Sequence, residues 1–249
     1  MKKVFAVIMF VSLLVAGCSQ SNDEQVELII SSAASLQHAL NDIQDNFEKE
    51  HPHVKVFFNY GGSGSLQQQI LYGAPVDVFF SASETKFNTL VDNEIIEISA
   101  DLVGNEIVLV VPHESNIATF TDLHKTNTIS IGTPETVPAG KYAQEALTSM
   151  ELWEAVSEKV VYAKDVRQVL TYVETGNVDA GIVYKTDALS SDKVKVVATA
   201  DQQLHTPIIY PVGIIKSAIH QDEAKLFFDF IQKEESIKIL EKYGFKGLD

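Results

Sequence analysis

From Val26 to the carboxyl terminus, short runs of β-forming residues alternate with segments whose apolar residues recur at helical spacing. The first such pair is typical. Residues 26–30 form a β-rich run, and the apolar positions that follow them are spaced i, i+3, i+4, i+7 and i+11, as on one face of a helix. These positions are Leu36, Ala39, Leu40, Ile43 and Phe47. This alternation predicts an α/β fold with mostly parallel sheets and helices on both faces.

The same pattern continues along the chain. Further strands are expected over residues 54–60, 76–80, 106–111, 129–131, 160–162, 180–184, 194–198 and 208–215. Further helices are expected over residues 66–71, 84–93, 139–150, 166–175, 186–189, 221–232 and 235–243. The last helix is expected to end at Gly244. The run 106–111 is apolar almost throughout, which is typical of a buried strand of the parallel type.

Size and charge narrow the class of protein. A chain of 249 residues can form two lobes or one large α/β domain. With 34 acidic against 19 basic side chains, its net charge of −15 does not suit a nucleic-acid binder, which presents a basic face to phosphate. The single cysteine, Cys18, excludes a disulfide framework and a thiolate metal cluster.

The amino terminus has the features of a secretory signal. Lys2 and Lys3 precede an apolar run over residues 4–15. This run is too short to span a membrane as a helix. The small residues before the cysteine, Val15-Ala16-Gly17-Cys18, resemble the lipobox of bacterial lipoproteins. We therefore expect residues 1–17 to be a signal peptide, Cys18 to be lipidated and residues 18–25 to be a tether at the outer face of the cell membrane. The alternative is an ordinary secreted protein with a chance cysteine.

Five strand-to-helix junctions carry small or hydroxyl-bearing residues. In open α/β sheets ligands bind beyond the carboxyl ends of the strands, where helix amino termini offer free N–H groups to anions. Ser35 and Asp165 are expected to cap helices, and Pro138 to open one. Each junction alone also fits an ordinary cap or turn, but together they offer many neutral donors and no convergent charge. The junctions are Ser31–Ser35, Gly61–Ser65, Val137–Gly140, Asp165–Arg167 and Val183–Tyr184.

Several motifs together resemble those of the molybdate-binding proteins of ABC importers. The likeness runs from about Val26 to Gly247. The chain departs from the family at Gly62, where the family often has serine. It also departs at Lys185-Thr186, which replace a small residue and a serine after Tyr184. The matching motifs are Ala33-Ala34-Ser35-Leu36, Gly73-Ala74-Pro75-Val76-Asp77-Val78-Phe79, Val137-Pro138-Ala139-Gly140, Asp165-Val166-Arg167, Gly181-Ile182-Val183-Tyr184 and Lys242-Tyr243-Gly244-Phe245.

The resemblance implies a two-lobed periplasmic-binding-protein fold of type II, with two hinge crossings. It also implies a monomeric, non-enzymatic binding protein that captures molybdate or tungstate between the lobes, uses no cofactor and delivers the anion to a membrane permease with its ATPase. Carried over motif by motif, the ligands are two serine hydroxyls, two backbone amides and one tyrosine hydroxyl, on Ser35, Ser63, Ala139, Val166 and Tyr184. Lobe 1 would comprise residues 26–104 and 211–249, and lobe 2 residues 105–210, with crossings near Asn105 and Tyr210.

Other ligand classes find less support in the residues. An amino-acid or peptide binder usually pairs an arginine with the ligand carboxylate, and Arg167 is the single arginine. A zinc or iron binder needs convergent ligands, and the nearest candidates, His51 and His53, lie at the opposite end of a helix from the junctions. An enzyme needs a nucleophile or an acid–base pair, and no histidine stands at a suggestive spacing from the serines.

Overall fold

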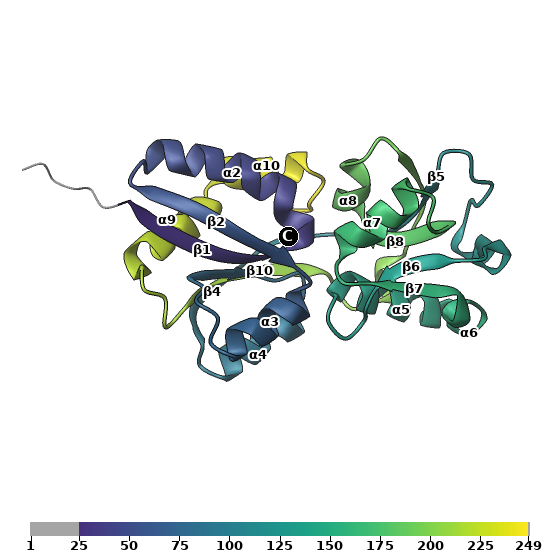
Figure 1. The fold of residues 1–249 in the computed structure, drawn as a ribbon, viewed down its shortest axis with the longest axis horizontal. Coiled ribbons are helices and arrows are strands. Elements are labelled where there is room, and N and C mark those ends of the chain that lie inside the picture. The colour runs from purple at the N-terminus through teal and green to yellow at the C-terminus, as the bar shows by residue number, and fades with distance from the viewer. Residues whose placement is uncertain (1–24, 249) are drawn as a thin grey trace, which may run out of the picture.

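The computed structural model describes residues 25–248, which form two α/β lobes, each built on a five-stranded sheet (Figure 1). This confirms the predicted fold class. The predicted signal peptide, the lipidation site Cys18 and the tether up to residue 24 lie outside the described residues. None of the helices in the described part of the chain is long and apolar enough to cross a membrane.

The first lobe carries helices on both faces of its sheet. Helices α2 (Gln37–Glu50), α9 (Gln221–Ile231) and α10 (Glu234–Lys242) cover one face, and α3 (Ser63–Leu71) and α4 (Glu84–Asp92) cover the other (Figure 1). A 3-10 turn, η1 (Ala34–Leu36), joins the first strand to α2. The strand order is β2 (Val54–Gly61), β1 (Val26–Ala33), β3 (Val78–Phe80), β10 (Ile209–Ile215) and β4 (Ile96–Gly104).

The second lobe repeats this architecture. Helices α7 (Val166–Glu174) and α8 (Lys185–Leu189) lie on one face of its sheet, and α5 (Pro138–Ser149) and α6 (Trp153–Val156) lie on the other (Figure 1). Short 3-10 turns complete it: η2 (Phe120–Lys125), η3 (Ser157–Lys159) and η4 (Gln202–Leu204). The strand order is β7 (Val160–Ala163), β6 (Ile129–Gly132), β8 (Ala180–Tyr184), β5 (Ile107–Pro112) and β9 (Val194–Thr199).

One strand of each described sheet runs against the others. In the first lobe β10 is antiparallel to both β3 and β4, and in the second β5 is antiparallel to both β8 and β9. The expectation that residues 106–111 form a strand of the parallel type is therefore wrong. Residues Ile107–Val111 are fully buried, and a continuous apolar run reports burial on both faces of a sheet rather than strand direction.

Strand β4 is not among the strands predicted from the sequence. Its sequence from Ile96 to Leu102 does alternate apolar and polar residues, but Ile98 lies exposed on the sheet and only the ends of the strand are buried. The period-two alternation was the signal that would have identified it.

The chain passes between the lobes twice, and the two passages lie side by side. Asn105 and Glu106 connect β4 to β5, and residues 200–208 connect β9 to β10. The Asn105 N–H donates to the Ile208 carbonyl at 3.3 Å, and Gly104 pairs with Lys246 near the carboxyl terminus. The predicted lobe boundaries fall at the end of β4 and inside β10, and the division into separately moving lobes stays a prediction.

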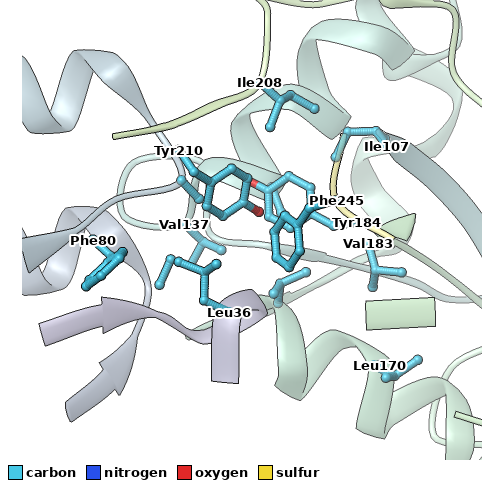
Figure 2. Close-up of a cluster of buried hydrophobic side chains, with 14 of the residues drawn as sticks. Leu36, Phe80, Ile107, Val137, Leu170, Val183, Tyr184, Ile208, Tyr210 and Phe245 are labelled. Atoms are coloured by element: carbon cyan, nitrogen blue, oxygen red, sulfur yellow. The ribbon is translucent and has the colours of Figure 1, made fainter. Parts of the chain in front are cut away.

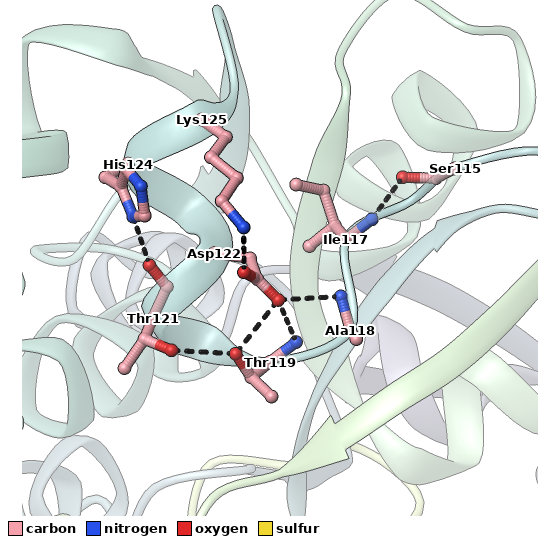
Figure 3. Close-up of polar contacts among 8 residues, drawn as sticks. All are labelled: Ser115, Ile117, Ala118, Thr119, Thr121, Asp122, His124 and Lys125. Carbon is pink, nitrogen blue, oxygen red and sulfur yellow. Dashed lines mark hydrogen bonds and ion pairs between the residues drawn. The ribbon is translucent and has the colours of Figure 1, made fainter.

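The turn η2, which links β5 to β6, is held by its own side chains (Figure 3). The Asp122 carboxylate accepts hydrogen bonds from the N–H groups of Ala118 and Thr119 at 3.1 and 3.0 Å. The ammonium of Lys125 lies 2.6 Å from the same carboxylate, and this hydrogen bond lowers the pKa of Asp122. This exposed network orders a surface turn, as a capping box does at a helix start.

Candidate functional site

All five predicted ligand residues line one small pocket between the two lobes. Its volume, measured as the space open to the centre of a water molecule, is about 10 Å³. A larger pocket, of about 480 Å³ by the same measure, is lined by residues that include Ile29, Pro75 and His220. None of the five predicted ligand residues lines it. The lining of the small pocket is Ala33, Ala34, Ser35, Gly61, Gly62, Ser63, Ala82, Val137, Pro138, Ala139, Val166 and Tyr184.

Ser35 reaches the pocket from η1, at the carboxyl end of β1. The prediction that it caps the first long helix is wrong, because it lies inside the 3-10 turn, whose N-cap is Ala33. Its buried hydroxyl is 2.9 Å from the hydroxyl of Tyr210 on β10. Ser35 is thus positioned by a strand that is distant in sequence.

Ser63 is the first residue of α3 and is fully buried. Its hydroxyl oxygen accepts a hydrogen bond from the Ala82 N–H at 2.9 Å. A hydroxyl oxygen that accepts in this way keeps its own proton for donation. Ser63 can therefore donate to an occupant of the pocket.

The two predicted backbone donors come from the second lobe. Ala139 follows Pro138 at the start of α5, and Val166 opens α7. The N–H groups of a helical first turn have no intrahelical partner and lie at the positive end of the helix dipole. Asp165 is the N-cap of α7, as predicted, and its carboxylate accepts from the Gln168 N–H at 2.9 Å. The Asp165 side chain thus leaves the Val166 N–H unused.

Tyr184 ends β8 and is 1% exposed. Its hydroxyl has no hydrogen-bond partner anywhere in residues 25–248. Burial raises the pKa of this phenol well above its ordinary value, so the oxygen keeps its proton. An unpaired buried hydroxyl is costly, and this one lines the pocket. Figure 2 shows its ring beside Tyr210, at a centroid separation of 5.8 Å.

The pocket lining contains no charged side chain. Arg167 is directed elsewhere, and its guanidinium donates to the Ser190 hydroxyl at 3.2 Å. Across the described residues there is no group of three His, Cys, Asp or Glu side chains placed to hold a metal ion. The site can therefore act on a ligand by neutral hydrogen-bond donation.

Three residues near the pocket bear on its chemistry but are not among the predicted ligand residues. Tyr210 and Asn105 were expected only as hinge positions, yet the Asn105 amide donates to the Tyr210 hydroxyl at 3.2 Å. Asp187, in the first turn of α8, is 1% exposed, and neither of its carboxylate oxygens is hydrogen-bonded within the described structure. No local sequence signal connects Tyr210 and Asn105 to the junctions, because their contacts span 81 to 175 positions. Asp187 follows Tyr184 by three positions, but its burial without a partner is visible only in the structure.

Comparison with known proteins agrees with this architecture. The profile of the bacterial extracellular solute-binding proteins matches residues 28–246. A Bacillus subtilis protein described as an ABC transporter substrate-binding lipoprotein, YvgL, is 53% identical over 97% of this chain and 96% of its own length. The molybdate-binding protein ModA of Haemophilus influenzae is 35% identical over 95% of this chain and 96% of its own length.

A solved structure is similar over nearly the same range. It is described as a substrate-binding domain of a molybdenum ABC transporter from Clostridium difficile. It shares 43% identity, with a TM-score of 0.69 over 90% of this chain and all of its own.

Two α/β lobes with an uncharged pocket between them match the two-lobed fold of periplasmic binding proteins. The chain belongs to the family of bacterial extracellular solute-binding proteins. These relatives are named for binding rather than for catalysis.

Proposed function

We propose that this protein captures molybdate or tungstate outside the cytoplasm and delivers it to an ABC importer. The anion would sit in the pocket between the lobes, bound by the Ser35 and Ser63 hydroxyls from the first lobe. The second lobe would add the N–H groups of Ala139 and Val166 and the Tyr184 hydroxyl.

One observation carries the proposal: five uncharged donors from both lobes line a pocket that holds no charged side chain. Burying a dianion is costly unless several hydrogen bonds replace its water. Hydrogen bonds to a charged acceptor contribute about 1.5–3 kcal/mol each, and the dipoles of α5 and α7 add to them. Five such donors provide a binding site that needs no counter-charge.

A site that only donates also selects the ligand's protonation state. Molybdate and tungstate are fully ionised near neutral pH and only accept hydrogen bonds. Hydrogen phosphate carries a proton that needs an acceptor, and no carboxylate lines the pocket. Sulfate has the same charge pattern as molybdate but is smaller, so the dimensions of the pocket must separate the two.

The transport partners in this proposal are inferred from the descriptions of the relatives. The protein from Bacillus subtilis and the structure from Clostridium difficile are both described as parts of ABC transporters. The partners would be a membrane permease and its ATPase. A lipid on Cys18 would hold the monomeric binding protein at the outer face of the membrane. This anchoring is testable by membrane fractionation of the parent and of Cys18→Ser.

A thermal-shift panel tests the ligand. Molybdate, tungstate, sulfate, phosphate, zinc and amino acids are each added to the purified protein. A ligand at a thousand times its dissociation constant stabilises the protein by about 4 kcal/mol, which is a clear shift in melting temperature. We expect shifts with molybdate and tungstate. A shift with zinc or an amino acid and none with molybdate would overturn the proposal, and a shift with sulfate alone would reassign the ligand.

A further inference from the structure

The start of helix α3 touches the second lobe directly, backbone against backbone. The Gly64 N–H donates to the Thr136 carbonyl at 2.9 Å, across the interface between the lobes. Gly64 follows the proposed ligand Ser63, and Thr136 lies three positions before the proposed ligand Ala139. The contact therefore lies next to donors from both lobes.

Two glycines make this approach possible. A Cβ on Gly64 would stand 2.8 Å from the Thr136 Cα and 2.9 Å from its carbonyl oxygen. A Cβ on Gly62 would stand 2.8 Å from the same oxygen and 3.1 Å from the Lys164 carbonyl oxygen. These neighbours are mainly backbone atoms of the second lobe, which cannot swing aside as a flexible side chain can. Any side chain at either position would hold the lobes further apart.

We propose that Gly62 and Gly64, pressed against Thr136, form the stop that sets how closely the lobes approach, and so the size of oxyanion the pocket accepts. This inference rests on the proposed function. Donors from the two lobes face the anion from opposite sides, so the width of the pocket follows the distance between the lobes. Gly62 and Gly64 flank Ser63 in the sequence. The distance between the lobes at this contact therefore directly sets the position of the Ser63 hydroxyl, a proposed ligand.

The physical consequence is a size filter. Hydrogen bonds weaken steeply when donor and acceptor are drawn apart by a few tenths of an ångström beyond their preferred range. If the lobes are held apart, a small anion loses contact with one lobe more completely than a large anion does. A side chain at the stop therefore weakens every oxyanion, and it weakens sulfate more than molybdate or tungstate.

Gly247, in the first lobe and outside the pocket lining, offers a matched control. A Cβ there meets only the Glu241 side-chain oxygen, at 3.5 Å, within the same lobe. The backbone of Gly62 is extended, at φ −68° and ψ 131°, and suits alanine. Gly64 lies in the first turn of α3, where alanine is a better helix former than glycine. Gly62→Ala and Gly64→Ala should therefore fold, and their melting temperatures without ligand should match that of Gly247→Ala.

The experiment is calorimetric titration of the parent and the three variants with molybdate and tungstate, with sulfate measured by competition. We expect Gly62→Ala and Gly64→Ala to bind molybdate at least about fivefold more weakly than the parent, as overpacking at a closed interface does. Gly247→Ala should stay within about twofold of the parent. The ratio of molybdate to sulfate affinity should rise in the two stop variants.

The outcomes separate the two proposals. Equal molybdate affinity in all three variants would overturn the stop, as would weaker binding with an unchanged or lower ratio of molybdate to sulfate affinity. Failure of the parent itself to bind molybdate or tungstate would overturn the proposed function, and the stop with it.

Discussion

The hydroxyl of Ser35 lies 2.9 Å from the hydroxyl of Tyr210, and the neighbouring groups favour one direction for this hydrogen bond. The Asn105 side-chain oxygen accepts the Glu106 N–H at 2.9 Å, so its amide nitrogen faces Tyr210 and donates to the phenol oxygen at 3.2 Å. Tyr210 can then give its own proton to Ser35, which leaves the Ser35 proton for the pocket.

Tyr210→Phe should weaken molybdate binding by about 0.5–1.5 kcal/mol, because Ser35 loses the partner that directs its proton into the pocket. Calorimetric titration measures the change. Tyr60→Phe is the control, since the Tyr60 hydroxyl bonds Asn41 on the outer face of the same lobe. Equal affinities in the two variants would show that Tyr210 does not orient Ser35.

Tyr184→Phe should weaken molybdate binding by about 1.5–3 kcal/mol without lowering the free energy of unfolding of the unliganded protein. The reason is that the Tyr184 hydroxyl has no partner among residues 25–248, so its removal breaks no hydrogen bond within them. Titration calorimetry and urea unfolding provide the two readouts.

Ser63→Ala is the informative contrast to Tyr184→Phe. It should weaken binding by a similar amount but also destabilise the unliganded protein by about 1 kcal/mol, because the Ala82 N–H loses its acceptor. If both variants bound as tightly as the parent, the ligand site would lie elsewhere.

Val166→Pro tests a backbone donor. Proline suits the first position of a helix, where no intrahelical bond uses the N–H. The preceding Asp165 is already extended, at φ −156° and ψ 169°, as a residue before proline must be. The variant should lose about 1.5–3 kcal/mol of molybdate affinity in calorimetric titration.

Val166→Ala is its control, because it keeps the N–H while removing methyl groups of the same buried side chain. Both variants should show a similar, modest loss of stability in urea unfolding. Proline and alanine variants that bind molybdate alike would mean that the Val166 N–H is not a ligand.

Asp187 predicts a pH dependence of stability. Burial raises the pKa of its carboxyl from 3.8 to about 7, against the opposing effect of the Arg167 guanidinium on α7. Asp165, Tyr184 and Tyr210 also face it. Between these two pKa values the native state holds a proton that the unfolded state has lost. The stability contributed by this proton is therefore complete below about pH 4 and is lost as the pH rises to about 7.

Asp187→Asn should remove this dependence while keeping the shape of the side chain. The free energy of unfolding of the parent minus that of the variant should fall by about 1.4 kcal/mol per pH unit from pH 5 to 6 and level off above pH 7. Urea unfolding at pH 5, 6, 7 and 8 measures it. A difference that does not change with pH would contradict the assignment of a raised pKa to Asp187.

Local sequence patterns were sufficient for most elements and for the donor types. The helical spacing from Leu36 to Phe47, the Asp165 cap and Pro138 at a helix start all depend on neighbours within a few residues, and the structure shows each of them. Strand direction was beyond such patterns. Burial on both faces makes β5 apolar whichever way it runs, so the sequence of that strand does not distinguish parallel from antiparallel pairing.

By itself, the sequence determined the α/β alternation and the presence of small and hydroxyl-bearing residues at the ends of strands, because propensity, capping and periodicity act over short distances. Only the tertiary structure decided which junctions meet in one pocket, that Tyr210 supports Ser35, and that Gly64 touches Thr136. These contacts join residues 72 to 175 positions apart. Their geometry is set by how two lobes pack against each other, and no local pattern contains that information.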